Sequence, residues 1–130
     1  MSAFRTAVES GDPERIVAEL ADDVVFHSPV AHAPYHGKAV VGMILRAVFR
    51  VFEGFRYEAE IGSEDEHVLV FRARVDDKDV EGIDLLRTGD DGKVTELTVM
   101  VRPLSAATAL AARMKVEYER GMAELAGAGD

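Results

Sequence analysis

The change of hydrophobic period near residue 54 constrains the fold of this chain more than any other feature. Before it, apolar residues recur at helical spacing, at Val41, Ile44, Leu45, Val48 and Phe52. After it, they alternate with polar residues, as they do in strands with one buried face. Helices grouped before strands predict an α+β protein whose helices lie against one face of a sheet.

Four segments after residue 54 carry the strand pattern, at about 55–61, 67–76, 80–88 and 94–102. The last two are joined by Gly-Asp-Asp-Gly, which is typical of a hairpin turn. Because the connections are too short for crossover helices, we expect an antiparallel sheet built from hairpins.

The N-terminal part predicts two short helices, one strand and a longer helix. Gly11 suits the end of the first helix, whose buried side holds Phe4, and Asp12 suits the cap of a second helix, at about 13–21. A strand at about 24–28 and a loop to residue 37 precede a third helix, at about 38–52. A final helix, from about 105 to 126, follows Pro103, with Ser105 as its expected cap.

We therefore expect residues 1–130 to form one domain, in which a curved, mostly antiparallel sheet closes over a pocket. Three N-terminal helices lie over one face, and the C-terminal helix either folds over the pocket entrance or packs across a subunit. The stripe on this last helix consists of Leu110, Met114, Tyr118, Met122 and Leu125.

Composition excludes several classes of partner. The net charge of −9 opposes binding to a phosphate backbone, so we expect no nucleic acid. No apolar run approaches the length of a membrane span, and the first residues do not resemble a signal peptide. The chain has no cysteine, which excludes disulfides and thiolate metal sites and fits a cytoplasmic location.

The order of elements and three sequence motifs resemble the NTF2-like superfamily. The motifs are Phe-His-Ser-Pro-Val at 26–30, Gly-Ile-Asp at 82–84 and Val-Met-Val-Arg-Pro-Leu at 99–104. They are similar to those of a bacterial SnoaL-like, ketosteroid isomerase-like group. The resemblance implies a cone-shaped fold, a hydrophobic pocket, no cofactor and a homodimer formed through the outer face of the sheet. Since the superfamily hosts isomerases, cyclases, dehydratases and noncatalytic proteins, fold alone does not select a function.

The resemblance carries over one of the three ketosteroid isomerase residues. The strand aspartate of that site matches Asp84, but the carboxylate base matches Ser28 and the helix tyrosine matches Phe4. Serine without an activating partner is a poor base, and phenylalanine donates no hydrogen bond. Efficient ketosteroid isomerase activity is therefore not expected.

Asp84 is the candidate catalytic residue. It interrupts an apolar strand, and the resemblance places it in the pocket wall, where burial would favour its protonated form. The alternative is a structural aspartate, either exposed on the outer face or paired with an arginine, the candidates being Arg72, Arg74 and Arg102.

The remaining site residues follow from the same matching. Expected pocket-lining residues are Phe4, Phe26, Ser28, Phe71, Leu86, Leu97, Val99 and Val101. Residues His32, Tyr35 and His36 are expected at the pocket mouth, and no metal site is expected. An apolar chamber of this kind suits a small apolar ligand with few polar groups.

Two functions remain open at this point. One is a cofactor-independent isomerase, cyclase or dehydratase that uses Asp84 as acid or base. The other is a noncatalytic ligand-binding or scaffold domain that keeps the pocket but lacks the chemistry. The substitutions at Phe4 and Ser28 favour the second, whereas the lone carboxylate in an apolar strand favours the first.

Overall fold

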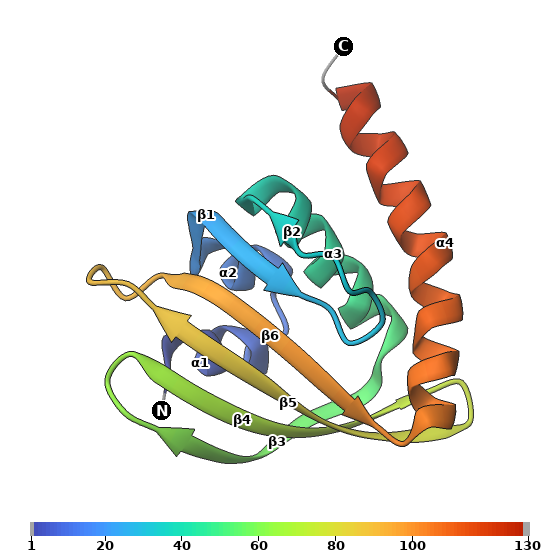
Figure 1. Cartoon of the computed structure of the whole chain (residues 1–130), viewed down its shortest axis with the longest axis horizontal. Helices are drawn as coiled ribbons and strands as arrows, with labels where there is room; N and C mark the ends of the chain where they lie inside the picture. Colours follow the sequence, from blue (N-terminus) through green and yellow to red (C-terminus); the bar gives the residue numbers. More distant parts are fainter. Residues whose placement is uncertain (1, 129–130) are drawn as a thin grey trace.

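The computed structural model describes residues 2–128 and shows the expected α+β architecture (Figure 1). Three helices precede most of the sheet: α1 (Ala3–Glu9), α2 (Pro13–Ala18) and α3 (Lys38–Val51). The six strands are β1 (Leu20–His27), β2 (Tyr35–His36), β3 (Glu53–Gly62), β4 (Glu66–Val75), β5 (Lys78–Thr88) and β6 (Val94–Arg102). Helix α4 (Leu104–Ala128) ends the described chain.

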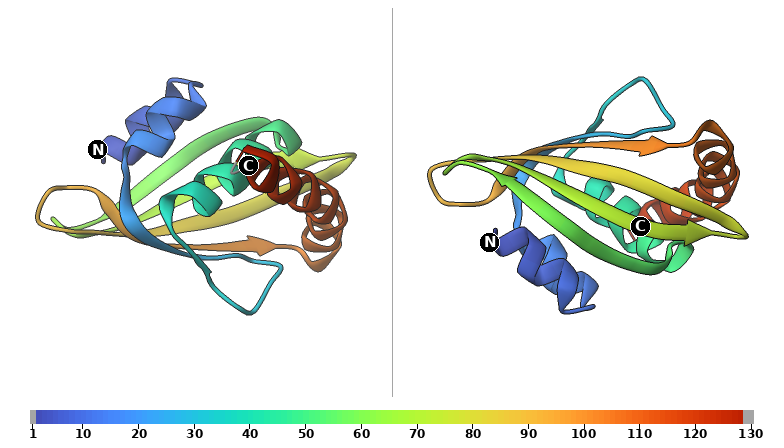
Figure 2. Two further views of the ribbon diagram at one scale, coloured as in Figure 1. Left: turned by 90° about the horizontal axis from the view of Figure 1, so that it is seen from above. Right: turned by 90° about the horizontal axis from the view of Figure 1, so that it is seen from below.

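The strands form a single twisted sheet in the order β2-β1-β6-β5-β4-β3. All neighbouring pairs are antiparallel except β1 and β6, so the sheet is mostly antiparallel, as expected. Helix α3 runs along the concave side, and α1 and α2 pack together near one end of it (Figure 2). Helix α4 packs against α3, β5 and β6 at its start and then rises beyond the sheet (Figure 1).

The capping residues act locally as the sequence indicates. The Asp12 side chain accepts a hydrogen bond from the backbone N–H of Glu14, and Pro13 takes the first helical position of α2. The Ser2 side chain accepts from the backbone N–H of Arg5 and caps α1 in the same way. These bonds fix where the two short helices start and so where their apolar faces point.

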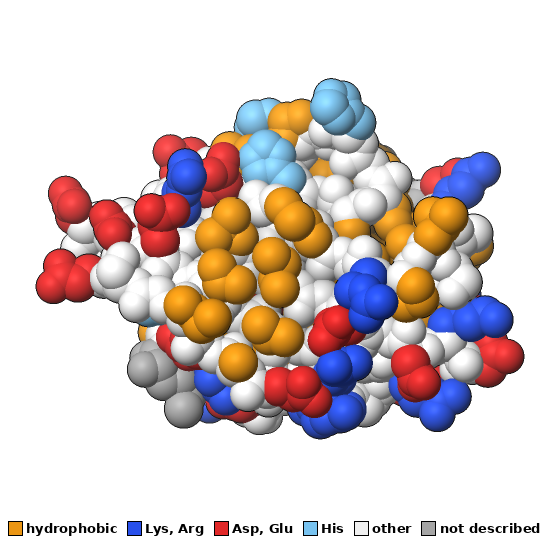
Figure 3. Space-filling model, turned by 60° about the horizontal axis from the view of Figure 1, so that its bottom comes forward, with side chains coloured by type: hydrophobic (Ala, Val, Ile, Leu, Met, Phe, Trp, Pro, Cys, Tyr) orange, Lys and Arg blue, Asp and Glu red, His pale blue; other side chains and the backbone are white. Residues whose placement is uncertain are grey.

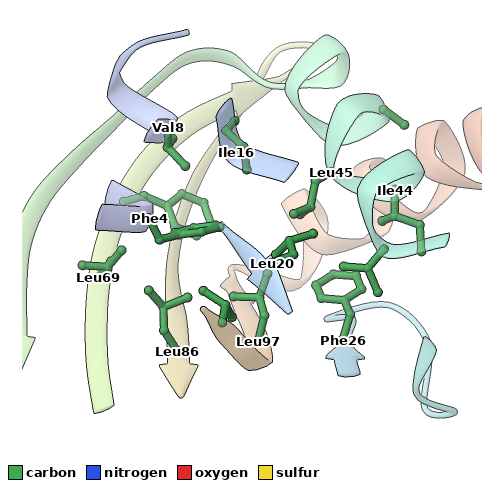
Figure 4. Close-up of a cluster of buried hydrophobic side chains, with 14 of the residues drawn as sticks. Phe4, Val8, Ile16, Leu20, Phe26, Ile44, Leu45, Leu69, Leu86 and Leu97 are labelled. Carbon is green, nitrogen blue, oxygen red and sulfur yellow. The ribbon is translucent and has the colours of Figure 1, made fainter. Parts of the chain in front are cut away.

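Side chains from the helices and the inner sheet face form one hydrophobic core. Phe4 points from α1 toward the sheet leucines Leu69 and Leu86, and Leu45 points down from α3 (Figure 4). Leu69, Leu86 and Leu97 are at most 1% exposed, so the middle of the sheet is fully covered. Burial of this kind is the main stabilising term for a chain of this length.

Several elements differ from the sequence prediction, and strand β1 begins at Leu20 instead of near residue 24. Helix α2 ends at Ala18 rather than near residue 21, because Leu20 already pairs with Val94 of β6. The two-residue strand β2 was not predicted; it pairs with β1 through Phe26 and Tyr35. Helix α4 starts at Leu104, so Ser105 lies in its first turn instead of capping it. Pairing between distant strands determines the end of α2 and the presence of β2, and local sequence patterns do not indicate such pairing.

A β-bulge interrupts the alternation in β3. The register shifts between Tyr57 and Ala59, so the regular pattern holds up to Tyr57 and then reverses. Glu60 becomes partly buried, whereas Ile61 is 69% exposed, although strict alternation would place Ile61 beside Tyr57. This irregularity matters for the surroundings of the site, because it turns Glu60 to the same side as Tyr57, which regular alternation already points inward.

None of the helices in residues 2–128 is long and apolar enough to cross a membrane.

Candidate functional site

Strand β5 presents its two faces to different environments. Val80, Gly82, Asp84 and Leu86 face inward and are buried, and Asp84 is only 7% exposed. Across the sheet, Asp84 lies between Leu69 of β4 and Val99 of β6. The carboxylate is therefore placed on the inner face, among apolar neighbours.

Asp84 is bound by a tyrosine, not by a cation. The hydroxyl of Tyr57, on β3, donates a hydrogen bond of 2.6 Å to Oδ2 of Asp84. The arginines considered as partners of Asp84 pair with other carboxylates: Arg72 and Arg102 pair with Glu81, and Arg74 pairs with Asp79. Within residues 2–128, the bond from Tyr57 is the one hydrogen bond that Asp84 makes, which leaves Oδ1 available to a ligand.

Burial controls the protonation of this pair. Desolvation raises the pKa of Asp84 to about 7, and the hydrogen bond from Tyr57 opposes part of that rise. The pKa of Tyr57 is raised well above its usual value, first by burial and then by the neighbouring charge of Asp84. Near neutral pH the site therefore holds a neutral tyrosine beside a carboxyl group that is partly protonated.

A cavity of about 380 Å³ opens on the inner face of the sheet, and Asp84 forms part of its wall. Of the residues expected there, the cavity is lined by Phe4, Phe26, Ser28, Tyr35, Phe71, Leu97 and Val99. The wall is mainly apolar and aromatic, which is typical of sites for small molecules.

Other expected site residues lie outside the cavity wall. Leu86 is fully buried beneath it, and Val101 is partly buried next to the core. His32 and His36 are exposed and do not line the cavity. Gly82 leaves no open space beside Asp84, because the ring of Phe71 packs directly against it.

Ser28 and His27 each have a local partner. The hydroxyl of Ser28 lines the cavity and accepts a hydrogen bond from the backbone N–H of Val30. His27 points the other way and lies 3.1 Å from a carboxylate oxygen of Glu96. Ser28 has no activating base among these contacts, so it is a polar lining residue and not a nucleophile.

Sequence reasoning missed much of the wall and the partner of Asp84. Helix α3 contributes Ile44, Leu45, Val48 and Phe49, and its C-cap residue Phe52 also lines the cavity. Helix α4 contributes Leu110, Ala111, Met114, Lys115, Tyr118 and Glu119. The stripe on α4 was identified, but which surface it covers depends on the long-range packing. Tyr57 had a usable signal: it alternates inward with Phe55, and a buried tyrosine hydroxyl needs a partner.

The aromatic side chains divide into two groups around the cavity. Phe52, Phe55 and Phe71 pack ring against ring, with Phe55 and Phe71 stacked at 4.9 Å between centroids. Tyr35 joins the other group, between Phe26 of β1 and Tyr118 of α4. Tyr118 and the rim residues Lys115 and Glu119 place polar groups at the α4 side of an otherwise apolar chamber.

Among residues 2–128, no group of three or more His, Asp or Glu side chains is arranged to hold a metal ion.

Comparisons with known proteins agree with this fold. The family model for the SnoaL-like domain matches residues 1–97. No curated protein matches the chain. Among solved structures, one from Pseudomonas aeruginosa described as a steroid delta-isomerase is 38% identical, with a TM-score of 0.86 over 92% of this chain and 89% of that chain.

Two further structures support the fold. A bacterial protein with a cystatin-like fold from Silicibacter pomeroyi is 31% identical, with a TM-score of 0.83 over 88% of this chain and 81% of that one. An NTF2-like protein from Mesorhizobium loti is 21% identical, with a TM-score of 0.67 over 77% and 85% of the two chains, and so supports the fold alone.

Proposed function

Because the chain belongs to the SnoaL-like domain family, we propose that it is a cofactor-independent enzyme that moves a proton on a small apolar ligand, with Asp84 as acid and base. The reaction classes that fit are isomerisation, cyclisation and dehydration. The single observation that carries the proposal is the buried carboxyl group of Asp84, hydrogen-bonded to Tyr57 and forming part of an apolar cavity wall.

The pair suits proton transfer near neutral pH. When Asp84 is protonated, its free oxygen can donate a hydrogen bond or a proton to a carbonyl or hydroxyl oxygen of the ligand. When Asp84 is ionised, the same oxygen can accept a proton from a ligand carbon or hydroxyl. Since its pKa is about 7, both forms are populated at neutral pH, which favours efficient acid–base catalysis.

Tyr57 has a different part in this scheme. Its hydroxyl donates to Oδ2 of Asp84, so it stabilises the carboxylate form after a proton has left. The tyrosine hydroxyl does not line the ligand cavity and is a positioning group for Asp84, not a direct contact to the ligand.

The residues around Asp84 limit which reaction is expected. No second carboxylate lies in the cavity wall within residues 2–128 except Glu119, at the α4 rim. One group must therefore both take and return the proton. The Pseudomonas steroid delta-isomerase supports isomerase-type chemistry on this fold. Because Phe4 and Ser28 stand where the ketosteroid isomerases have a tyrosine and a carboxylate, we expect only slow turnover of a steroid.

A noncatalytic binding role is the second candidate. The observation that favours it is Ser28, which lines the cavity where the family base is expected and has only a backbone partner. In that case Asp84, held in place by Tyr57, would anchor a polar atom of the ligand without changing it. Apolar ligands would then stabilise the protein while remaining chemically intact.

A thermal-shift screen followed by product analysis distinguishes the two functions. The panel consists of apolar ketones, enones and hydroxy compounds and includes a steroid. Compounds that raise the Tm are incubated with the protein and examined by mass spectrometry and by NMR in D₂O, which also detects isomerisation and hydrogen exchange. Conversion that disappears in Asp84→Asn supports the enzyme. Stabilising ligands that never exchange or convert support the binding protein.

The outer face of the sheet supports a homodimer. Cross-strand neighbours on β4, β5 and β6 place a set of apolar residues together on this face: Val68, Val70, Ile83, Leu85 and Met100. Figure 3 shows a hydrophobic area bordered by acidic and basic side chains. Met100 is 54% exposed in the isolated chain. An apolar centre with a rim of both charges suits a second copy related by a twofold axis.

The cytoplasm is the proposed location, on the ground that the chain has no cysteine.

A further inference from the structure

A group of charged side chains meets Tyr57 outside the ligand cavity. The guanidinium carbon of Arg5, on α1, lies 5.8 Å from the centre of the Tyr57 ring. The side chain of Arg5 is 18% exposed, and it does not line the cavity. Arg5 follows Phe4, which does line the cavity, so α1 contacts the site on two sides: through an apolar ring and through a cation.

The β-bulge brings the counter-charge to the same place. Beyond Tyr57 the register of β3 shifts, and Glu60 turns toward α1. One oxygen of Glu60 lies 3.5 Å from Nη1 of Arg5. The other accepts the backbone N–H of Ser2 at 3.0 Å and lies 3.1 Å from Nδ1 of His67.

The ion pair of Arg5 is long, although it is well shielded from water. Its contacts to Glu60 and Glu9 are both 3.5 Å, and Arg5 Nε and Glu60 Oε1 are buried without a hydrogen-bond partner among the described residues. By contrast, the exposed Arg46 binds both oxygens of Glu14 at 2.9 and 3.0 Å. Because these contacts are long, Glu60 and Glu9 neutralise the charge of Arg5 less completely. That charge therefore acts more strongly on its other neighbour, the Tyr57 ring.

We propose that Arg5 is a positioning residue of the Asp84–Tyr57 pair: its cation polarises the Tyr57 phenol, so that the hydroxyl donates more strongly to Asp84. A nearby positive charge favours the shift of negative charge onto a phenol oxygen, and the low polarity of the interior strengthens that effect. The ionised form of Asp84 is stabilised in turn. The consequence for turnover depends on the proposed acid–base function, whereas the electrostatic effect on Asp84 does not.

Several charged groups face this site from the surrounding elements. Glu9 lies on α1, Glu60 on β3 and His67 on β4, and all three are within 4 Å of Arg5 or of its partner Glu60. Glu9 opposes the effect of Arg5 on Tyr57, because its negative charge raises the pKa of the phenol whereas the charge of Arg5 lowers it. Removal of Arg5 should therefore raise the pKa of Asp84, and removal of Glu9 should lower it.

The test is the pKa of the Asp84 carboxyl group, measured by ¹³C NMR on the ligand-free protein. In Arg5→Met, which keeps an unbranched apolar side chain but removes the charge, we expect this pKa to rise by roughly half a unit or more. Arg5→Lys should restore most of the original value. The control is Arg46→Met, which removes one cation from the same acidic protein at a remote pair and should leave Asp84 unchanged.

A second variant keeps the proposal testable if Arg5→Met does not fold. Glu9 is more exposed than Arg5, and Glu9→Gln should lower the pKa of Asp84. An unchanged value in a folded Arg5→Met, or in Glu9→Gln when Arg5→Met does not fold, contradicts the proposal. So does Arg5→Lys behaving like Arg5→Met, because Arg5 would then only anchor α1. If Asp84 itself titrates in its usual range in the unchanged protein, the proposed function fails as well.

Discussion

Two of the carboxylates on strand β5, Glu81 and Asp84, lie three residues apart and face opposite sides of the sheet. On the outer side, Glu81 lies 2.7 Å from Arg72 and 3.0 Å from Arg102. On the inner side, Asp84 has no cationic partner among residues 2–128 and is held by the hydroxyl of Tyr57. The same strand thus holds one carboxylate whose charge is balanced and one whose charge is not.

The difference teaches what the surroundings of an acid do to its chemistry. On the outer face, Glu81 is partly exposed and pairs with two arginines, so it contributes to structure. Burial without a cation brings Asp84 close to half protonation at neutral pH, where it can exchange a proton with a ligand. Position within the strand, and not residue type, separates the structural acid from the candidate catalytic one.

The largest expected effect is on turnover. Asp84→Asn should lower kcat of the identified reaction by roughly 100- to 10,000-fold, because the amide cannot accept or deliver the proton. The matched change on the outer face, Glu81→Gln, should alter kcat by less than about twofold, since it disturbs only surface ion pairs. Steady-state kinetics on both variants with the same substrate checks the contrast. Equal losses in the two variants would place the chemistry elsewhere.

The next effect is on the pH dependence of stability. The pKa of Asp84 is raised from 3.8 to about 7 in the folded state, so its contribution is fully present below pH 3.8 and is lost as the pH rises toward 7. Asn resembles the neutral acid and lacks this dependence. We therefore compare the unfolding free energies of Asp84→Asn and the unchanged protein at pH 5 and at pH 8. Between these pH values their difference should change by about 2 to 3 kcal/mol in favour of Asp84→Asn.

Urea unfolding at the two pH values measures this difference. Glu81→Gln serves as the control and should follow the unchanged protein within about 1 kcal/mol at both pH values. A constant difference between Asp84→Asn and the unchanged protein would mean that Asp84 is ionised throughout this range.

Tyr57→Phe removes the one hydrogen-bond partner that Asp84 has among residues 2–128 and should change how Asp84 titrates. The hydroxyl stabilises the ionised carboxylate, so its loss should raise the pKa of Asp84 by about 1 to 2 units. The pH optimum of a reaction that needs the carboxylate should move upward with it. Tyr35→Phe is the control, because Tyr35 also lines the cavity but makes no hydrogen bond to Asp84. Identical profiles for the two variants would contradict the role given to Tyr57.

The outer face offers a prediction of smaller size. If this face joins two copies, Met100→Lys should raise the dimer dissociation constant by at least about tenfold, since a charge would enter the apolar centre. Val116→Lys is the matched control, because Val116, on α4, is 55% exposed and Met100 is 54% exposed. Sedimentation velocity checks both variants. A monomeric unchanged protein, or equal behaviour of the two variants, would rule out this interface.

Much of the fold could be predicted because its signals are local. The change of period, the turn at 89–92 and the Asp12-Pro13 start of α2 each depend on neighbouring residues, and the structure has the corresponding elements. The end of α2 and the strand β2 depend on pairing with distant strands, so the same patterns placed the first wrongly and missed the second.

The candidate site likewise has one part that local patterns predict and one part that depends on distant strands. Regular alternation along β5 puts Asp84 on the same face as Val80 and Leu86, and the structure buries all three. The partner was harder to predict, because Tyr57 reaches Asp84 from a strand that is not its neighbour and next to a bulge that ends the alternation. Glu60 shows the effect of that bulge most clearly, because regular alternation places it on the outer face, whereas in the structure it is partly buried.

The pKa of the Asp84 carboxyl group tests the central claim most directly. A ¹³C NMR titration of the ligand-free protein, assigned by the loss of one signal in Asp84→Asn, follows this group from pH 3 to pH 9. The account predicts a midpoint near 7. A midpoint near 4, in the range of an exposed aspartate, would contradict it, because Asp84 would then be an ordinary ionised residue with no reserve of protons at neutral pH.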